Sequence, residues 1–294
     1  MTAETEVRLE IASSSATISK LGAEPREWLV EGRSLLWSGD PAWWGQRSPI
    51  LFPVVGWTRN AEMRIKGKRY PLALHGFAAK ERFELLLQSK NSATFRLLNS
   101  EATRALYPFD FELLVEYRLD ETKLTAKFMV HNRGKEPMPY ALGLHPGFVL
   151  PLPGAGTGDP HRVVFGKGVS PEVPVIAPGG LISARRRSLP LEGGVLQLSP
   201  ELFANDALCF LDAAATDLAF ENGRGDAIAI SAEAFPHMAL WTKPGAPFLC
   251  IECWTGYSDP EGFEGDIFDK PSMRVLLPDE MARHAVTYEW RSAR

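Results

Sequence analysis

Residues 111–132 read FELLVEYRLDETKLTAKFMVHN, two runs of alternating apolar and polar residues separated by a polar break at Asp120-Glu121-Thr122. Alternation with a period of two is typical of strands that bury one face. The apolar residues that share the buried faces are Val115, Tyr117, Leu119, Leu124, Ala126, Phe128 and Val130. The pattern predicts two antiparallel strands, Phe111–Leu119 and Lys123–Asn132, that pack over one core.

The rest of the chain reads as one short strand after another. Proline and glycine are scattered, and no convincing amphipathic helix is present, although residues 200–205 could form one turn. Pro151–Pro160 is rich in glycine and proline and is expected to be a loop within the domain. The other expected strands are residues 7–11, 16–21, 28–30, 34–37, 83–88, 93–99, 197–198, 208–211, 218–221, 227–231, 237–241 and 285–289. The sequence therefore predicts an all-β protein, a large antiparallel β-sandwich forming a single domain over residues 1–294.

Composition excludes several classes of partner. The net charge of −4 and the pI near 5.9 leave no basic footprint for nucleic acid or an anionic membrane. Arg185-Arg186-Arg187 is the only dense basic run, and it is expected to be a solvated loop face. The polar N-terminus contains no signal-peptide h-region, and no apolar run has membrane-spanning length. We expect a cytoplasmic protein.

The three cysteines do not indicate a metal or redox site. Cys250 and Cys253 have the spacing of a CxxC motif, but in a strand they point to opposite faces. Neither a second pair nor a histidine cluster accompanies them, so we expect reduced thiols and no zinc.

One carboxylate stands in an apolar strand. Residues 247–256 read PFLCIECWTG, and alternation places Glu252 on one face with Phe248, Cys250 and Trp254. Glutamate is almost never fully buried without a partner, because the uncompensated charge is costly to desolvate. Glu252 is therefore either a structural residue with a buried partner or part of a polar cleft.

Two histidines favour the cleft. His145 lies at the end of an expected strand, where Ala141 and Gly143 share its face, and Pro146-Gly147 then ends that strand. Small neighbours beside a histidine are what the approach of a ligand requires. His75 lies in the similar run Leu72–Ala78, which is also expected to end a strand beside a glycine. A single histidine is more often structural than catalytic, but two of them together with Glu252 indicate a shared site.

Five segments, in this order, resemble the aldose 1-epimerase (galactose mutarotase) family, and in particular its LacX-like bacterial branch. They are RSPILFPVVG (47–56), LHGFA (74–78), GLHPGF (143–148), LFANDAL (202–208) and CIECWTG (250–256). The resemblance spans most of the chain. It implies the extended sandwich of that family and the interconversion of the α and β anomers of a hexose.

The resemblance also implies roles for particular residues. Glu252 would be the general base, His145 the general acid, and His75 a hydrogen-bonding group near the ring oxygen. Asp206 would bind sugar hydroxyls and Arg47 would orient the substrate. One positioned carboxylate and one imidazolium are sufficient for ring opening and closure, so no cofactor or metal is expected. The expected partner is a small-molecule sugar, bound by a monomer or a homodimer.

Alternatives stay open for the substrate-binding residues. Arg59 competes with Arg47, and Asp206 could simply cap a turn. Trp254 shares the face of Glu252 and either stacks on the sugar or belongs to the core. We expect His75, His145, Asp206 and Glu252 to line one cleft on the larger sheet, with Arg47 at its rim.

The substrate is open as well. Relatives that act on hexose 6-phosphates carry an arginine after the His-Gly-Phe-Ala block, where this chain has Ala79 and then Lys80. Lysine lacks the bidentate geometry of arginine, so the resemblance favours a neutral aldose over a hexose 6-phosphate. In a continued strand, Lys80 and Arg82 would point away from the face of Ala79. A non-catalytic carbohydrate-binding sandwich is the alternative from another class, and it would need no paired His145 and Glu252. A scaffold protein has only fold-level analogy behind it.

Overall fold

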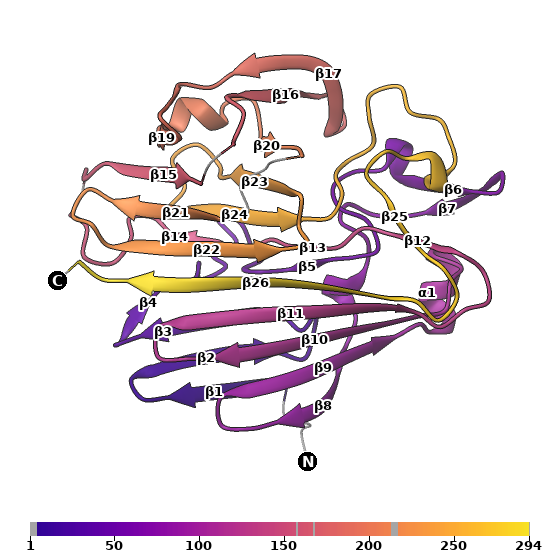
Figure 1. Ribbon diagram of the computed structural model, residues 1–294, viewed down its shortest axis with the longest axis horizontal. Coiled ribbons are helices and arrows are strands. Elements are labelled where there is room, and N and C mark those ends of the chain that lie inside the picture. Colours follow the sequence, from indigo (N-terminus) through magenta and orange to yellow (C-terminus); the bar gives the residue numbers. More distant parts are fainter. Residues whose placement is uncertain (1–4, 157, 167, 213–216, 294) are drawn as a thin grey trace.

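The computed structural model describes residues 5–156, 158–166, 168–212 and 217–293, and it consists mainly of antiparallel strands (Figure 1). The largest sheet has ten strands. In spatial order they are β18 (Leu191–Glu192), β19 (Val195–Gln197), β15 (His161–Phe165), β21 (Asp217–Asn222), β22 (Ala227–Glu233), β26 (Met281–Arg291), β11 (Lys123–Asn132), β10 (Phe111–Leu119), β9 (Ser92–Leu98) and β8 (Glu84–Gln88).

A six-stranded sheet carries strands from the segments RSPILFPVVG, GLHPGF and CIECWTG. Its order is β20 (Leu208–Phe210), β23 (His237–Trp241), β24 (Phe248–Trp254), β13 (Gly143–Leu144) and β5 (Ile50–Leu51), with β14 (Gly147–Val149) also paired to β24. A four-stranded sheet is made of β1 (Glu6–Ile11), β2 (Ser14–Ser19), β3 (Pro25–Val30) and β4 (Arg33–Ser34).

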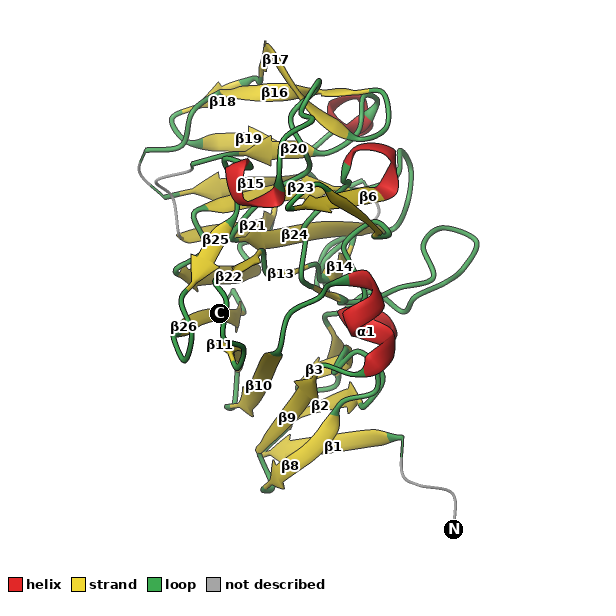
Figure 2. Ribbon diagram, turned by 90° about the vertical axis from the view of Figure 1, so that its right-hand side faces the viewer, coloured by secondary structure: helices red, strands yellow, loops and turns green. Residues whose placement is uncertain are grey.

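Short hairpins and helical turns complete the fold (Figure 2). The two-stranded sheets are β6 (Glu62–Ile65) with β7 (Lys68–Pro71), β12 (Met138–Tyr140) with β25 (Arg274–Leu276), and β16 (Glu172–Ala177) with β17 (Leu181–Ser188). The helical segments are α1 (Glu101–Leu106) and the 3₁₀ turns η1 (Arg59–Ala61), η2 (Ala78–Lys80), η3 (Pro200–Phe203) and η4 (Ile267–Asp269). Among the described residues, no helix is both long and apolar enough to cross a membrane.

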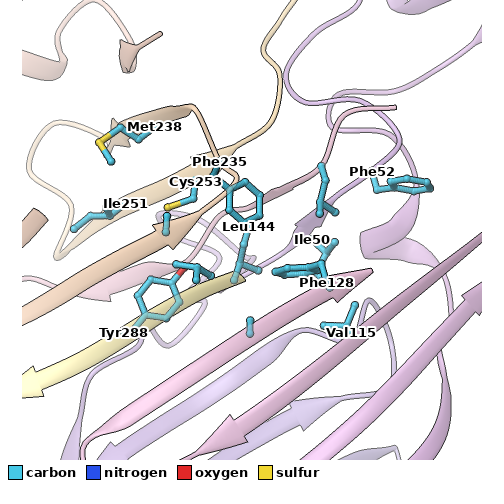
Figure 3. Packing of buried hydrophobic residues seen from close by; sticks show 14 of the residues in the cluster. Ile50, Phe52, Val115, Phe128, Leu144, Phe235, Met238, Ile251, Cys253 and Tyr288 are labelled. Atoms are coloured by element: carbon cyan, nitrogen blue, oxygen red, sulfur yellow. The ribbon is translucent and has the colours of Figure 1, made fainter. Parts of the chain in front are cut away.

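One buried cluster joins the large sheets. It contains Trp28 from the four-stranded sheet, Phe128 from the ten-stranded sheet and Ile251 from the six-stranded sheet. Figure 3 shows Phe128 and Tyr288 across from Ile251 and Leu144 within this cluster. The predicted β-sandwich is confirmed, because the apolar faces of separate sheets pack on one another.

The two strands predicted within residues 111–132 form as predicted. Strands β10 and β11 are antiparallel neighbours, with Val115 opposite Phe128 and Leu119 opposite Leu124 at the turn. Their alternate apolar residues are buried in the main core. Period-two alternation alone was sufficient here because one face of the pair is core and the other is not.

Some segments differ from expectation. Arg185–Arg187 is not a loop but part of β17, where its first two residues are exposed. The hairpins β6–β7 and β16–β17 and strand β15 are not predicted, and β16 reads EVPVIA without an alternation of apolar and polar residues. Helix α1 is also unforeseen, and it is held by a capping box between Ser100 and Thr103.

The two faces of β24 are divided as predicted. Leu249, Ile251 and Cys253 belong to the main core, whereas Phe248 and Cys250 pack in a separate cluster on the other face. All seven residues of β24 are buried. Glu252 is therefore held away from the main core by strand alternation and is covered by loops from other parts of the chain.

Two buried tyrosines allow a matched test of the core. The Tyr117 hydroxyl donates a 2.8 Å hydrogen bond to the carbonyl oxygen of Ala23, whereas the Tyr288 hydroxyl has no partner among the described residues. We expect Tyr117→Phe to lower the free energy of unfolding by about 1–3 kcal/mol, because the Ala23 carbonyl is left unsatisfied. Tyr288→Phe should be neutral or stabilising, because it removes a buried hydroxyl that makes no hydrogen bond among the described residues. Urea unfolding followed by circular dichroism measures both, and equal losses for the two variants would contradict this account.

Candidate active site

The register of β24 brings the two central residues together. Strand β24 pairs with β13, Leu144 opposite Cys253, and again with β14, Gly147 opposite Cys250. The same register places His145 opposite Glu252, so both side chains leave the sheet on the same face. His145 Nε2 lies 3.2 Å from Glu252 Oε1. These two residues, 107 positions apart in the sequence, are direct cross-strand neighbours.

Residues without bulk make room around the pair. Ala239 lies opposite Glu252 on its other side. Gly143 and Gly147 flank His145 on the same face, and a Cβ atom at Gly143 would lie only 2.8 Å from the Trp254 indole. Small residues beside His145 were expected to admit a ligand. At Gly143, however, the space is filled by Trp254 and by Leu51.

Trp254 holds the carboxylate. Its indole Nε1 donates a 3.0 Å hydrogen bond to Glu252 Oε2, while the other carboxylate oxygen faces His145. Trp254 also lines the pocket and is only 6% exposed. Of the two interpretations left open for this residue, sugar stacking or core packing, the structure supports core packing, because Trp254 belongs to a buried cluster with Leu51 and Ala239. Its hydrogen bond to Glu252 is a further contact that neither interpretation included.

Burial moves the two pKa values in opposite directions. The pKa of Glu252 is raised well above 4.5 by burial, and it is raised further by the charge of Asp206, although the hydrogen bond from Trp254 lowers it. The pKa of His145 is lowered well below 6.5 by burial and by nearby His75. Both shifts disfavour an unaccompanied charge on either group, so they favour the state in which the pair holds a single proton.

His75 is a fixed hydrogen-bond donor. Its Nδ1 accepts a 3.0 Å hydrogen bond from the backbone N–H of Gly56, so the neutral ring carries its proton on Nε2. Burial lowers the pKa of His75 to about 4, which keeps the ring neutral at pH 7. Its ring lies edge-on to that of His145, with 5.6 Å between the ring centres.

The backbone around His75 is a turn and not the expected strand end. His75 has a φ of 63° and Gly76 a φ of 75°. A Cβ atom at Gly76 would lie 2.3 Å from the carbonyl oxygen of Phe52. The close approach of the backbone at Phe52 to the turn therefore requires glycine at position 76. This turn, and not strand geometry, directs the His75 ring into the pocket.

Asp206 lies in a turn and also lines the pocket. It follows η3 in a left-handed conformation, φ 75°, and its Oδ1 accepts a hydrogen bond from the N–H of Ala207. It also lines the pocket as an exposed carboxylate. Asp206 therefore shapes the turn and offers its remaining lone pairs to the cavity.

These side chains line one pocket of about 290 Å³. It lies on the six-stranded sheet and not on the larger sheet, where it was expected. His75, His145, Asp206, Glu252 and Trp254 all contribute. The other lining residues are Trp44, Gln46, Gly56, Trp57, Leu74, Ile176, Gly180, Ile182, Ala207, Cys209, Trp241 and Ser258.

Sequence reasoning missed the aromatic surroundings of His145. The Trp44 indole stacks on the His145 ring with 4.9 Å between ring centres, and Trp241 meets it edge-on at 5.8 Å. Trp44 lies in a loop, residues 38–49, that shows no regular alternation of apolar and polar residues. The sequence feature that could have indicated its place at the site is the pair Trp43-Trp44 close to the RSPILFPVVG segment. These rings exclude water from one side of the imidazole and contribute to the burial that lowers its pKa.

Neither candidate arginine lines this pocket. The guanidinium of Arg47 donates to the carbonyl oxygen of Arg26 at 2.8 Å, and its backbone N–H donates to Glu24. Arg47 thus joins two segments of the chain, and we do not assign it a substrate contact. Arg59 lies in an adjoining groove, where it is paired with Glu264 at 2.8 Å.

The residues considered for phosphate binding, Ala79, Lys80 and Arg82, also lie outside the pocket. Ala79 and Lys80 belong to the 3₁₀ turn η2, not to a continuing strand. Neither they nor Arg82 line the pocket. In the described part of the chain, no three histidine, cysteine, aspartate or glutamate side chains are grouped in a way that could hold a metal ion.

Comparison with known proteins agrees with the sequence motifs. Residues 5–178, more than half of the chain, match the family described as aldose 1-epimerase. The plasmid-encoded and chromosomal LacX proteins of Lactococcus lactis subsp. lactis are 31% and 32% identical over 259 residues, which cover 84% of this chain and 86% of each relative.

Solved structures show the same architecture. A galactose mutarotase-like protein from Lactobacillus casei superposes with a TM-score of 0.91 and 25% identity, over 97% of this chain and 100% of that one. A galactose mutarotase related enzyme from Lactobacillus acidophilus has a TM-score of 0.90 and 29% identity, over 98% and 97% of the two chains. By sequence and by fold, this chain belongs to the aldose 1-epimerase family.

Proposed function

We propose that this protein is an aldose 1-epimerase that interconverts the α and β anomers of a neutral hexose. The observation that carries the proposal is the buried contact of 3.2 Å between His145 Nε2 and Glu252 Oε1 at the base of an open pocket. A carboxylic acid and an imidazole that share one proton are the two groups that ring opening needs. Membership of the family supports the same reaction class.

The reaction follows from the positions of these groups. Glu252, as carboxylate, takes the proton from the anomeric hydroxyl O1, and the released electron pair forms the C1=O1 double bond. The C1–O5 bond breaks, and the ring oxygen O5 takes the proton of the His145 imidazolium. Rotation about C1–C2 presents the other face of the aldehyde, and the reverse proton transfers close the ring.

The neighbouring residues support the charges that develop. His75, as a neutral Nε2–H donor, stabilises the electron-rich ring oxygen, and Trp254 steadies the carboxylate of Glu252 through its indole N–H. Asp206 accepts hydrogen bonds from sugar hydroxyls. A carbohydrate-binding protein without catalysis would not need an acid and a base aligned in cross-strand register, and this disfavours that alternative.

Removing either member of the pair should abolish most of the activity. We expect Glu252→Gln and His145→Asn each to lower kcat by about 10²–10⁴-fold, because each removes one general acid–base step. Exchange NMR between the anomeric protons of glucose and galactose measures the rate. His161→Gln is a matched control, because His161 is also buried but lies on β15 outside the pocket. Near-normal rates in a folded Glu252 or His145 variant would remove that residue from the mechanism.

The shared proton predicts an unusually broad pH profile. Free groups with pKa values of 4.5 and 6.5 would hold one proton only between those values. In the buried pair, losing that proton leaves a carboxylate without a cation, and gaining a second leaves an imidazolium without an anion. We therefore expect kcat/KM to stay flat across pH 4.5–6.5 and to fall only outside it on both sides. A profile that falls near pH 6.5, with the fold intact by circular dichroism, would contradict the shared-proton pair.

Trp254 should act on Glu252 and not only on packing. Trp254→Phe keeps the ring and removes the donor to Oε2, and a hydrogen bond to a charged group is worth about 1.5–3 kcal/mol, so kcat should fall by roughly tenfold or more. Because that hydrogen bond lowers the pKa of Glu252, its loss should move the alkaline limb of the profile to higher pH. Trp290→Phe is the control, since its buried indole N–H has no partner among the described residues. If the alkaline limb does not move, Trp254 contributes only to packing and does not act on Glu252.

A further inference from the structure

A second cavity adjoins the pocket. This side groove, of about 580 Å³, has one wall at the turn Thr58–Ala61 and the other at the turn Pro178–Leu181 between β16 and β17. Trp57, Gly180 and Asp206 line both the groove and the pocket. The two spaces therefore adjoin at these three residues, which form the border between the pocket and the side groove.

The indole of Trp57 stands at the junction. It is 38% exposed although it lies between two cavities, and its backbone is held by a hydrogen bond from its N–H to Ser258 Oγ and one from the N–H of Asp259 to its carbonyl. Its ring edge rests on Gly180, where a Cβ atom would lie 2.1 Å from Trp57 Cδ1. Trp57 is thus a flat, positioned and accessible aromatic surface, of the kind on which the apolar face of a pyranose ring packs.

The charges of the side groove favour a neutral occupant. Arg59 is the only basic residue in its lining, and its guanidinium is paired with Glu264 at 2.8 Å. Asp206 adds an exposed carboxylate at the junction with the pocket. A phosphate or another anionic substituent would meet a paired cation and a like charge, whereas the hydroxyls of a sugar can bond to Asp206, Asn60 and the backbone of both turns.

From the shared border and the exposed Trp57 ring we infer that the preferred substrate is a neutral reducing disaccharide, with its reducing ring in the pocket and its second ring in the side groove against Trp57. The inference rests on the proposed function and names the substrate class of the same site. It also gives a role to Pro178, Gly179 and Leu181 in the β16–β17 turn, because they line the side groove and not the pocket.

The first test compares substrates by exchange NMR at the anomeric centre. The panel contains glucose, galactose, glucose 6-phosphate, and disaccharides linked to glucose at O2 (sophorose), O3 (laminaribiose), O4 (maltose, cellobiose and lactose) and O6 (isomaltose). We expect at least one linkage to raise kcat/KM by about tenfold over free glucose, the scale of one added ring contact. If no disaccharide in the panel exceeds glucose, or if glucose 6-phosphate exceeds them all, the inference is overturned while the epimerase proposal stands.

The second test blocks the side groove alone. Gly179 lines only the groove, has a φ of 81°, and faces open space except for Leu181 Cγ at 4.0 Å. Asparagine tolerates this conformation, so Gly179→Asn should fill the groove without disturbing the fold. It should remove the advantage of the preferred disaccharide and leave kcat/KM for glucose unchanged. Gly32→Asn is the matched control, with a φ of 75° and nothing within 4 Å, in the β3–β4 turn.

A binding measurement separates this inference from the proposed function. Calorimetric titration of the Glu252→Gln variant should show tighter binding of the preferred disaccharide than of glucose, and adding Gly179→Asn should abolish the difference. If no sugar is epimerised by the wild-type protein but this binding difference is seen, the epimerase proposal fails and the groove assignment survives. Equal binding of both sugars, or an equal loss for both on blocking the groove, would overturn the inference.

Discussion

The site depends on one constraint, the register of β24 against β13 and β14. A shift of one residue would turn Glu252 toward the main core and place Ile251 in the pocket. The register is held on both sides, because Leu249, Ile251 and Cys253 pack into the core while β23 pairs along the other edge of the strand. The free energy of core packing thus fixes the distance between His145 and Glu252.

This arrangement explains how a glutamate can be buried in an apolar strand. Glu252 Oε1 lies 3.2 Å from the cross-strand His145 Nε2, and Oε2 accepts the hydrogen bond of the Trp254 indole N–H, so each carboxylate oxygen has a polar neighbour. The single proton held by the pair avoids the cost of an isolated buried charge. The same burial that would destabilise either group alone makes each more responsive to a substrate hydroxyl that arrives in the pocket.

The surrounding loops add what the sheet does not supply. The turn at His75 contributes a neutral donor, η3 contributes Asp206, and the Trp44 loop covers the face of His145. The β16–β17 hairpin extends the cavity outward from Gly180 to Gly179. The sheet therefore carries His145 and Glu252, and loops shape the pocket around them.

Local sequence determined the pair β10–β11 and the two faces of β24, because period-two alternation directly reflects which side of a strand is buried. It did not indicate the hairpins β6–β7 and β16–β17 or strand β15. It did indicate Glu252 and the two histidines, since a carboxylate in an apolar run and glycine beside histidine are visible without a fold. The tertiary structure alone decided that Arg47 bonds to a backbone carbonyl, that Trp254 serves Glu252, and that Trp44 and Trp57 border the cavity. Those contacts join segments far apart in the chain, and their geometry depends on loop conformations that side-chain periodicity does not encode.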